Sequence, residues 1–271
     1  MGIFSRNFNK PGPGVSKDEP RKKGTARLIE LLGRHFGDLV KLNLLFCLCV
    51  APSVVVFILS ILFYNPITQA VAFILSLVLA FPVGGVITSC VYYVTKMMRD
   101  DPSYVWFEFK RKFVENFKQA APMGILCTAF VYAQVLLWIS FVASDPATGN
   151  LLLIVAALLS LVVFGMITPY IFLHFAYVEL GTFKIIKNSV LMSFGYLPRS
   201  FMGSILGGII WTVFALFFPA SMLLFFPVII FFGVTLSMLL CMMWTWAPFD
   251  KHFKVEETLV ARMQEAEGKQ G

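Results

Sequence analysis

Long uncharged stretches dominate the pattern of hydrophobic and polar positions along the chain. Four of them contain no Asp, Glu, Lys or Arg, at 42–95, 119–144, 146–178 and 200–249. A helix that crosses a bilayer needs roughly 20 mostly apolar residues, so the two shorter stretches hold one crossing helix each and the two longer ones hold two each. The pattern therefore predicts an all-α membrane protein with six transmembrane helices.

Turn-forming residues divide the two longer stretches. Asn65 and Pro66 interrupt the first, because both favour turns and the residue before a proline is pushed out of the helical region. The other long stretch divides less clearly, at Pro219 or at Pro227. The six predicted spans are 42–64, 68–95, 120–143, 150–177, 200–218 and 221–246.

A short amphipathic segment precedes each predicted pair of spans. In each segment four apolar residues recur at i, i+3, i+7 and i+11, which places them on one face of a helix, and the same interval separates the first segment from the second and the second from the third. These residues are Ile29, Leu32, Phe36 and Val40, then Trp106, Phe109, Phe113 and Phe117, then Phe183, Ile186, Val190 and Phe194. The alternative is a chance alignment of unrelated amphipathic helices. We favour three parallel hairpin repeats, at about 24–98, 101–178 and 179–249, each preceded by an amphipathic cytoplasmic interfacial helix.

The distribution of charge gives the predicted spans an orientation. All 22 Lys and Arg residues lie before the first span or after the second, fourth and sixth, and the opposite loops carry a single charge, Asp145. Short cytoplasmic loops are enriched in Lys and Arg, so both termini are predicted to be cytoplasmic and the protein to lie in the cytoplasmic (inner) cell membrane. The six-span domain at 24–249 then connects a flexible basic tail at 1–23 to a cytoplasmic C-terminal tail at 250–271.

Composition excludes the soluble classes of protein. Hydrophobic residues make up 58% of the 271 residues and charged residues 14%, whereas a soluble domain has roughly 45–50% and about 25%. A protein of this size needs a polar surface in water, so a soluble enzyme, a disordered chain and a nucleic-acid-binding domain are excluded. The net charge of +7 reflects topology instead, and the basic tail is expected to be attracted to the anionic lipid headgroups of the bilayer.

The predicted spans contain few groups that could carry chemistry. His174 is the only charged or readily protonated candidate, and a hydrogen bond to a nearby backbone group is favoured over a role in proton transfer. The cysteines lack the spacing of a metal site or a disulfide framework, so they are interpreted as small apolar residues. They are Cys47, Cys49, Cys90, Cys127 and Cys241. No catalytic residue, cofactor or metal site is predicted.

Uncharged polar residues and prolines in the spans have two interpretations. The polar residues could line a path for a small solute, but hydrogen bonds between helices, worth roughly 0.6–2 kcal/mol each, are the favoured role. These residues are Asn43, Gln69, Thr88, Gln134 and Thr168. Pro82 and Pro169 lie inside the second and fourth spans, where each is predicted to kink its helix.

The second amphipathic segment is the most aromatic and is the candidate interface. Asp100 and Asp101 open it, which is a helix-start pattern. The segment could contact lipid or another protein, and simple anchoring in the membrane is favoured. The candidate interface residues are Tyr104, Trp106, Phe107, Phe109, Lys110, Asn116 and Lys118.

Two runs of the sequence resemble the YesL-like family of bacterial integral membrane proteins. One is the run Asn-Lys-Pro-Gly-Pro-Gly-Val at 9–15 with the basic run at 17–23, and the other is Val-Trp-Phe-Glu-Phe-Lys at 105–110, continued at 115–119. The resemblance covers the whole chain and includes the number and order of the spans. It implies a domain of unknown function whose genes often accompany carbohydrate ABC importers, and it supplies no catalytic or binding residues to carry over.

Two functions are therefore considered. The first is a non-enzymatic accessory component of carbohydrate uptake or utilisation, with subunits of an ABC-type importer as partners. The alternative is a small-solute or sugar permease, or a substrate-binding membrane subunit in its own right. It ranks second because no loop on the cytoplasmic side has the Glu-Ala-Ala…Gly pattern with which importer permeases dock their ATPase. An intramembrane enzyme ranks last, since the spans lack a set of polar catalytic groups.

The charge pattern makes a testable prediction about orientation. Green fluorescent protein fused after Gly271 should fluoresce and alkaline phosphatase fused there should be inactive, because the basic C-terminal tail is predicted to stay in the cytoplasm. The same two reporters inserted after Asp145 should behave the opposite way. Phosphatase activity from the fusion after Gly271 would contradict the predicted orientation.

Overall fold

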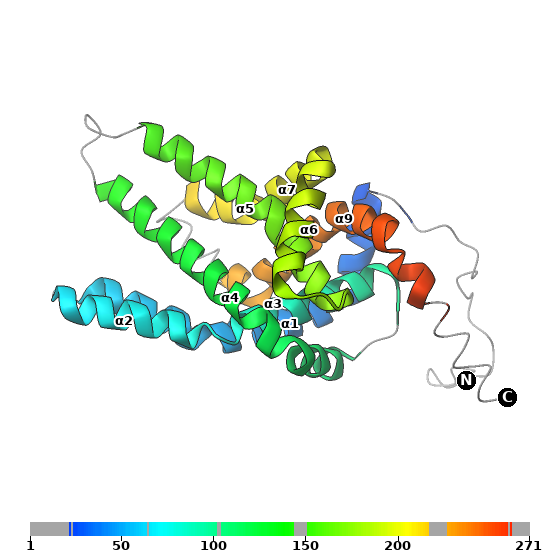
Figure 1. The fold of residues 1–271 in the computed structure, drawn as a ribbon, viewed down its shortest axis with the longest axis horizontal. Coiled ribbons are helices and arrows are strands. Elements are labelled where there is room, and N and C mark those ends of the chain that lie inside the picture. Colours follow the sequence, from blue (N-terminus) through cyan, green and yellow to red (C-terminus); the bar gives the residue numbers. More distant parts are fainter. Residues whose placement is uncertain are drawn as a thin grey trace, which may run out of the picture. The chain divides into compact units, whose positions relative to one another are not determined.

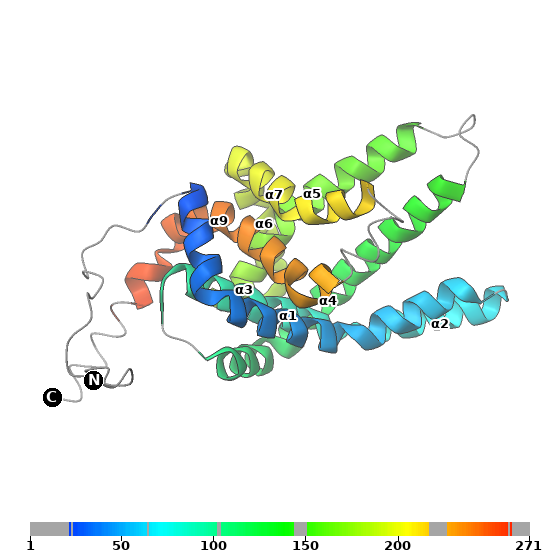
Figure 2. The same ribbon diagram turned by 180° about the vertical axis from the view of Figure 1, so that it is seen from behind.

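The computed structural model describes residues 22, 24–63, 65–101, 104–143, 151–216, 227–259 and 261. Within these residues every regular element is a helix and no strand occurs. The elements are α1 (Gly24–Leu62), α2 (Pro66–Leu79), α3 (Val83–Met98), α4 (Val105–Ala143), α5 (Leu151–Tyr177), α6 (Thr182–Gly195), α7 (Leu197–Leu216), the π-helix η1 (Ile229–Gly233) and α9 (Val234–Phe253) (Figures 1 and 2). The chain divides into two compact units, 1–34 and 35–271, and each is described by itself.

The first unit contains the beginning of α1. Within it, a carboxylate oxygen of Glu30 lies 3.2 Å from Arg27 and the other lies 2.6 Å from Arg34. Pairs three and four residues apart support a helix by a few tenths of a kcal/mol each. At His35, the first residue of the second unit, the backbone leaves the helical region with φ −118° and ψ 16°. This local break lies within the amphipathic segment, between Leu32 and Phe36.

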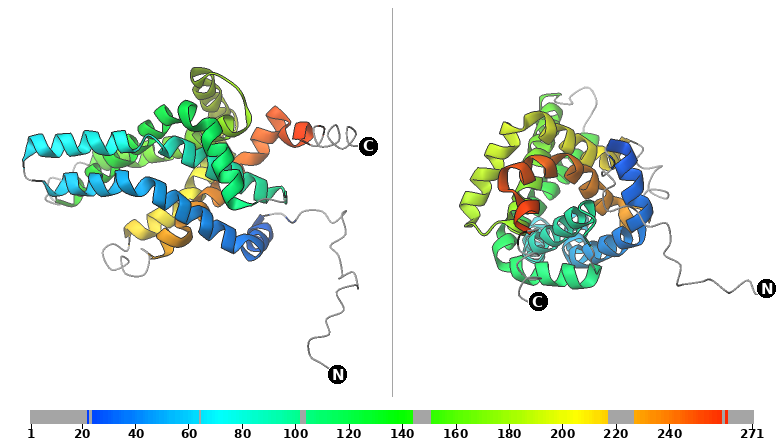
Figure 3. Two further views of the ribbon diagram at one scale, coloured as in Figure 1. Left: turned by 90° about the horizontal axis from the view of Figure 1, so that it is seen from below. Right: turned by 90° about the vertical axis from the view of Figure 1, so that its right-hand side faces the viewer.

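Three helices of the second unit, α3, α5 and α9, form its core. Each of the three packs against the other two, and the right-hand view of Figure 3 shows α3 beside α9 near the middle. Large, fully buried side chains such as Tyr93, Phe172 and Phe249 lie on these helices. Outside the core, α4 packs most extensively on α3, α7 packs on α9 and α5, and α6 packs on α5.

Among the described residues, four helices are long and apolar enough to cross a membrane: α1, α4, α5 and η1 continued by α9. The number rises to five if α2 and α3, which are bent by 40° at a short break, form one span. The predicted spans 200–218 and 221–246 both include residues outside the described part, so the total of six stays a prediction. The N-terminal tail lies outside it except for residue 22, and the C-terminal tail is described at 250–259 and 261, where α9 continues to Phe253, past the predicted domain end at residue 249.

Proline has different effects in the two spans where a kink is predicted. Pro82 lies at the break between α2 and α3 and confirms the prediction, because it cannot supply the backbone N–H that would continue a helix. Pro169 lies inside α5, which continues through it as one helix from Leu151 to Tyr177.

The amphipathic segments connect to their spans in different ways. In α4 the segment runs on into the span as one helix of 39 residues that contains Pro122. Figure 1 shows the first turns of α4 nearly end-on while its remainder runs across the view, so the helix changes direction. The third segment is instead a separate helix, α6, because Tyr196 leaves the helical conformation before α7 begins at Leu197.

Small residues permit very close helix contacts at two places in the second unit. A methyl group added to Gly84 would overlap the carbonyl oxygen of Ala120, and one added to Gly124 would overlap the backbone nitrogen of Gly84. The backbones of α3 and α4 are therefore in direct contact. Between α5 and α7, a methyl group on Gly165 would overlap the hydroxyl oxygen of Ser204. Such contacts between small residues are a principal source of helix association in lipid.

Asn43 makes a comparable contact between α1 and the last apolar helix. Its side-chain nitrogen donates to the carbonyl oxygens of Ile229 at 3.0 Å and Ile230 at 2.6 Å, and its side-chain oxygen accepts from the backbone N–H of Thr235 at 3.0 Å. The π-helix η1 interrupts the regular hydrogen-bond ladder here, and the fully buried Asn43 supplies partners for its carbonyls. The helix-to-helix hydrogen bonding predicted for Asn43 is confirmed.

We expect Gly84→Ala to destabilise the protein, because the added methyl group must push the α3 and α4 backbones apart. Overpacking of this kind costs typically about 1–3 kcal/mol, so the midpoint of thermal unfolding in detergent should fall by several degrees. Gly208→Ala in α7 is the matched control, because a methyl group there would meet no atom within 4 Å. Equal unfolding midpoints for the two variants would contradict the direct backbone contact.

Candidate functional site

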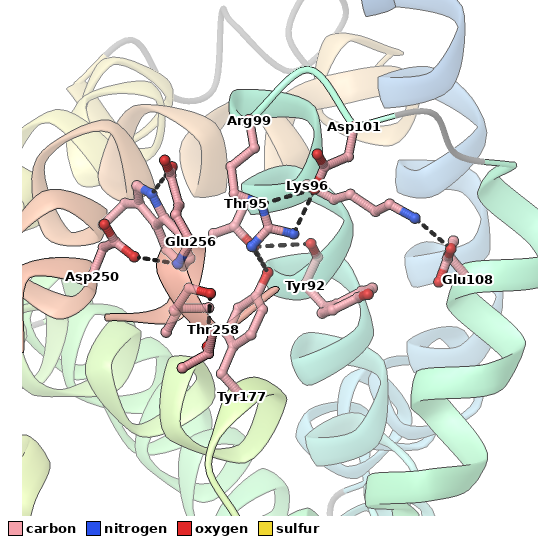
Figure 4. A network of polar contacts seen from close by, with 12 residues as sticks. Tyr92, Thr95, Lys96, Arg99, Asp101, Glu108, Tyr177, Asp250, Glu256 and Thr258 are labelled. Carbon is pink, nitrogen blue, oxygen red and sulfur yellow. Dashed lines mark hydrogen bonds and ion pairs between the residues drawn. The ribbon is translucent and has the colours of Figure 1, made fainter. Parts of the chain in front are cut away.

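Charged side chains gather where α3 ends and α4 begins. We call this region the charged end and define it by Lys96, Arg99, Asp101, Glu108 and Arg111, of which the first four are labelled in Figure 4. Helix α5 reaches the same region with Tyr177, and α9 reaches it with Trp246. The charged end is thus the place where the three core helices and the start of α4 meet.

The end of α3 is a left-handed turn. Asp100 has a φ of 61°, and the backbone N–H groups of Asp100 and Asp101 donate to the carbonyls of Met97 at 3.0 Å and Lys96 at 3.2 Å. These two bonds are those of the Schellman motif, which closes the end of a helix. The two aspartates therefore end α3, and the prediction that they begin the next helix is wrong, since α4 begins only at Val105. The turn directs Asp101 back towards α3.

Arg99 is the central residue of the charged end. Its side chain is only 4% exposed, and its Nε donates to Oδ2 of Asp101 at 2.9 Å. Its Nη1 donates to the hydroxyl of Tyr177 at 3.2 Å. The guanidinium carbon also lies 5.4 Å from the ring centroids of both Tyr177 and Trp246, within the range of cation–π attraction. One cation therefore joins α3, α5 and α9.

A directed chain of hydrogen bonds continues from Arg99. The hydroxyls of Tyr177 and Thr95 are 2.6 Å apart, and Thr95 donates its own proton to the carbonyl of Val91 at 2.9 Å. Tyr177 therefore donates to Thr95 and accepts from Arg99. Burial disfavours the charged form of Arg99, but Tyr177 and Asp101 outweigh it, so the pKa of Arg99 lies above its ordinary value. The side chain is positively charged at every physiological pH.

The end of α9 holds Trp246 beside Arg99. Lys254 follows α9 with a φ of 49°, and its backbone N–H donates to the carbonyl of Asp250 at 2.6 Å. The chain then turns back, so that the N–H of Glu256 donates to the Asp250 carboxylate at 2.8 Å. The Glu256 carboxylate accepts from the Trp246 indole at 3.4 Å. Residues that follow α9 thus position an aromatic ring inside the charged end.

Glu108 attaches the beginning of α4 to the end of α3. Its carboxylate accepts from Lys96 at 2.6 Å and from Arg111 at 2.5 Å, and its side chain is 8% exposed. Arg111 also donates to the hydroxyl of Tyr92 on α3 at 3.0 Å. A buried carboxylate between two cations fixes the rotation of α4 about its own axis, because only one face of the helix can present Glu108 to Lys96.

The candidate interface is divided by this rotation into an exposed and a buried set. The exposed residues are Tyr104, Trp106, Phe107, Lys110 and Lys118. Phe109 and Asn116 are buried instead, because they share the Glu108 side of the helix. Phe109 stacks on Phe113, and Asn116 donates to the carbonyl of Lys112 in its own helix at 3.0 Å. The structure thus brings five of the seven residues to the surface, and their role as an interface stays a prediction.

The remaining polar residues of the spans serve the helices themselves. Gln134 of α4 donates to Ser160 of α5 at 2.8 Å, which confirms helix-to-helix bonding for this residue. Thr88 and Thr168 donate to carbonyls of their own helices, at 2.8 and 2.7 Å, and Gln69 is exposed on α2. The hydrogen bonds predicted between helices are therefore not confirmed for Thr88, Thr168 and Gln69.

His174 is fully buried between α5, α6 and α9. Its Nδ1 lies 2.7 Å from the carbonyl oxygen of Tyr170 and 3.1 Å from the hydroxyl of Ser189, and its ring meets the edges of Phe249 and Phe253. The predicted bond to a backbone group is confirmed. Within the part of the chain that the structure describes, no cluster of three or more His, Cys, Asp or Glu residues could hold a metal ion.

No family model, curated protein or solved structure matches the chain. The relationship to the YesL-like family therefore stays a prediction, and the interpretation of the charged end depends on its own geometry.

The sequence does not single out Arg99, Tyr177 and Trp246 as a group. They come from three helices, and 78 residues separate Arg99 from Tyr177. The only available signal is an aromatic residue near the end of the fourth and the sixth predicted span. Aromatic residues are common at such ends in membrane proteins, so that signal alone does not indicate a shared cation.

We expect Tyr177→Phe to destabilise the protein, because the Arg99 and Thr95 side chains would each lose a buried hydrogen-bond partner. The cost should be about 1–3 kcal/mol, measured as a lower midpoint of thermal unfolding in detergent. Tyr104→Phe is the matched control, because Tyr104 is 85% exposed. If both variants unfold at the temperature of the unaltered protein, the hydrogen-bond chain from Arg99 does not stabilise the fold.

Proposed function

We propose that the chain is a multi-pass protein of the cytoplasmic membrane, with both termini in the cytoplasm. It serves as a non-enzymatic accessory component in carbohydrate uptake or utilisation by an ABC-type importer. The observation that carries this proposal is that the buried charges of the charged end, and the side-chain amides of Asn43 and Gln134, join helices to one another.

The charged end supports an accessory role over transport or catalysis. A substrate site inside a membrane protein needs polar groups that face the substrate, and intramembrane ionisable groups usually mark such a site. Here the buried charges of Arg99 and Glu108 are compensated by Asp101, Lys96 and Arg111. Away from the charged end, the side-chain amides of Asn43 and Gln134 are likewise bonded to neighbouring helices. Because the charges of the charged end are paired with one another, this region suits a protein that positions other subunits.

The link to carbohydrate uptake is supported by the resemblance to the YesL-like family. The run at 105–110 that contributes to the resemblance is also where α4 exposes Trp106 and Phe107.

Close contacts between helices support an arrangement of six spans in three parallel repeats. Asn43, Gly124 and Ser204 follow one another at nearly equal intervals along the chain, and the interval from Gly84 to Gly165 equals that from Asn43 to Gly124. In each contact the first span of one repeat meets the second span of the preceding repeat: α4 meets α3, and α7 meets α5. The first span of the first repeat, in α1, meets η1, which belongs to the second span of the third repeat. Three repeats arranged around a common axis require such a cyclic order.

The spacing of the helix starts supports the same arrangement and refines the predicted offset. The starts of α1 and α4 are as far apart along the chain as Asn43 and Gly124, whereas the starts of α4 and α6 are closer together. The interval between the close contacts of α4 and α7, from Gly124 to Ser204, is longer than the interval between the starts of α4 and α6. The additional residues fall at the break around Tyr196, which divides α6 from α7. A short insertion at this break thus accounts for the longer interval between close contacts from α4 to α7 than between the starts of α4 and α6.

The proposed function is tested by gene deletion together with purification from native membranes. In the organism that carries the gene, deletion should slow growth on at least one complex glycan and leave growth on glucose unchanged, and the intact gene should restore growth. The tagged full-length protein should co-purify with importer subunits from detergent-solubilised membranes. Unchanged growth on every glycan and purification without importer subunits would overturn the proposal. Oligosaccharide uptake by vesicles that contain the purified protein alone would favour the permease instead.

A further inference from the structure

The first turns of α4 expose an apolar and basic face. Trp106, Phe107 and Val114 are 64%, 63% and 67% exposed, and Lys110 and Lys118 are exposed on the same side. The opposite side of the helix is fixed on α3 by Glu108 and other buried residues. We call these five exposed residues the α4 face.

Helix α6 exposes a second face of the same composition. Phe183, Leu191 and Phe194 are 81%, 60% and 52% exposed, and Lys184 and Lys187 are exposed beside them. The opposite side, which includes Ile185 and Met192, is buried. We call the five exposed residues the α6 face.

We propose that the α4 face and the α6 face lie in the headgroup region of one membrane leaflet and bind anionic phospholipids. The aromatic and aliphatic side chains enter the boundary of the acyl chains, and the lysine ammonium groups contact lipid phosphates. The identification of this leaflet as the cytoplasmic one rests on the proposed orientation.

The first argument is the combination of residue types. Interfacial helices combine Trp, Phe and Leu on the buried side with Lys that reaches the headgroups, and both faces have this combination. Protein–protein interfaces also use aromatic residues, but their cores are depleted in Lys. With two exposed lysines on each face, the composition favours a lipid surface over a protein partner.

The second argument is charge complementarity. The acidic residues at the beginning of α4 are neutralised in place, since Glu108 lies between Lys96 and Arg111 and Glu115 pairs with Lys112 at 2.7 Å. Helix α6 contains no acidic residue. Both faces therefore present positive charge outwards, and each basic residue near an anionic leaflet contributes about 1 kcal/mol.

The third argument is the place of these helices in the fold. The beginning of α4 changes direction and then continues without interruption as a helix long and apolar enough to cross a membrane (Figure 1). Helix α6 leads into the apolar α7 after a single residue. Both amphipathic helices are thus attached directly to apolar ones, as interfacial helices beside a membrane span are.

Photo-crosslinking in vesicles tests the proposal. The full-length chain with benzoylphenylalanine at Phe107 or at Phe183 is reconstituted in equimolar phosphatidylglycerol and phosphatidylcholine and irradiated. Intact-mass measurement should find the protein plus one phospholipid at both positions, whereas the label at Phe172, which is 1% exposed, should capture none. Absence of lipid adducts at 107 and 183 would overturn the proposal, and so would cross-links to another protein chain in native membranes.

The identity of the captured lipid tests the role of the lysines. At position 107 phosphatidylglycerol should be captured several-fold more often than phosphatidylcholine, and Lys110→Gln with Lys118→Gln should bring the ratio close to one. The matched control, Lys251→Gln with Lys254→Gln, removes two exposed lysines from the end of α9 and should leave the ratio unchanged. An unaltered ratio in the first pair would overturn anionic-lipid binding, while co-purification of importer subunits would be unaffected and would still test the proposed function separately.

Discussion

The packing of α3, α5 and α9 at the charged end depends on the compensation of one buried cation. A guanidinium removed from water loses its hydration, and only partners in good geometry can offset that loss. Arg99 obtains them from its own turn through Asp101, from α5 through Tyr177 and from α9 through Trp246. Because each partner comes from a different element, displacement of α5 would remove the acceptor Tyr177, and displacement of α9 would remove the Trp246 ring. The cost of breaking this network therefore fixes the relative positions of the three helices at this end.

Away from the charged end, association of the helices requires other interactions. Lipid tails are as apolar as the side chains, so burial of apolar area does not drive helices together in a bilayer, and close packing and hydrogen bonds must do so. The chain uses both: the Gly84 and Gly124 backbones touch, and Asn43 supplies partners for the carbonyls of the π-helix. In the first case a small residue permits a close backbone contact, and in the second a polar residue permits a hydrogen bond between helices. A larger apolar residue would prevent both. A larger residue at Gly84 or Gly124 would require a backbone to move.

These interactions also decide how much could be predicted from the sequence. The apolar stretches, the break at Pro82 and the bonding of Asn43 follow from constraints that the bilayer or the backbone imposes on each segment separately. The contact of Arg99 with Tyr177 could not be predicted, because it depends on which helices become neighbours. For the candidate interface, helical periodicity places Trp106 and Phe109 on one stripe, but Glu108 anchors the helix in a rotation that exposes the first and buries the second. Apolarity alone does not tell a core-facing stripe from a lipid-facing one when both surroundings are apolar.

The same ion pairs that stabilise the charged end also determine what it presents outwards. Lys96 and Arg111 neutralise Glu108 on the inner side of α4 and Lys112 pairs with the exposed Glu115, so Lys110 and Lys118 are presented outwards beside aromatic rings. A helix that compensated its charges on the outer side instead would be neutral towards a lipid phosphate. Pairing of both acidic residues with neighbouring cations thus leaves Lys110 and Lys118 as the outward positive charge. Since the rotation of α4 is fixed by that pairing, the aromatic and basic face is organised before any contact forms, which reduces the entropy that binding must overcome.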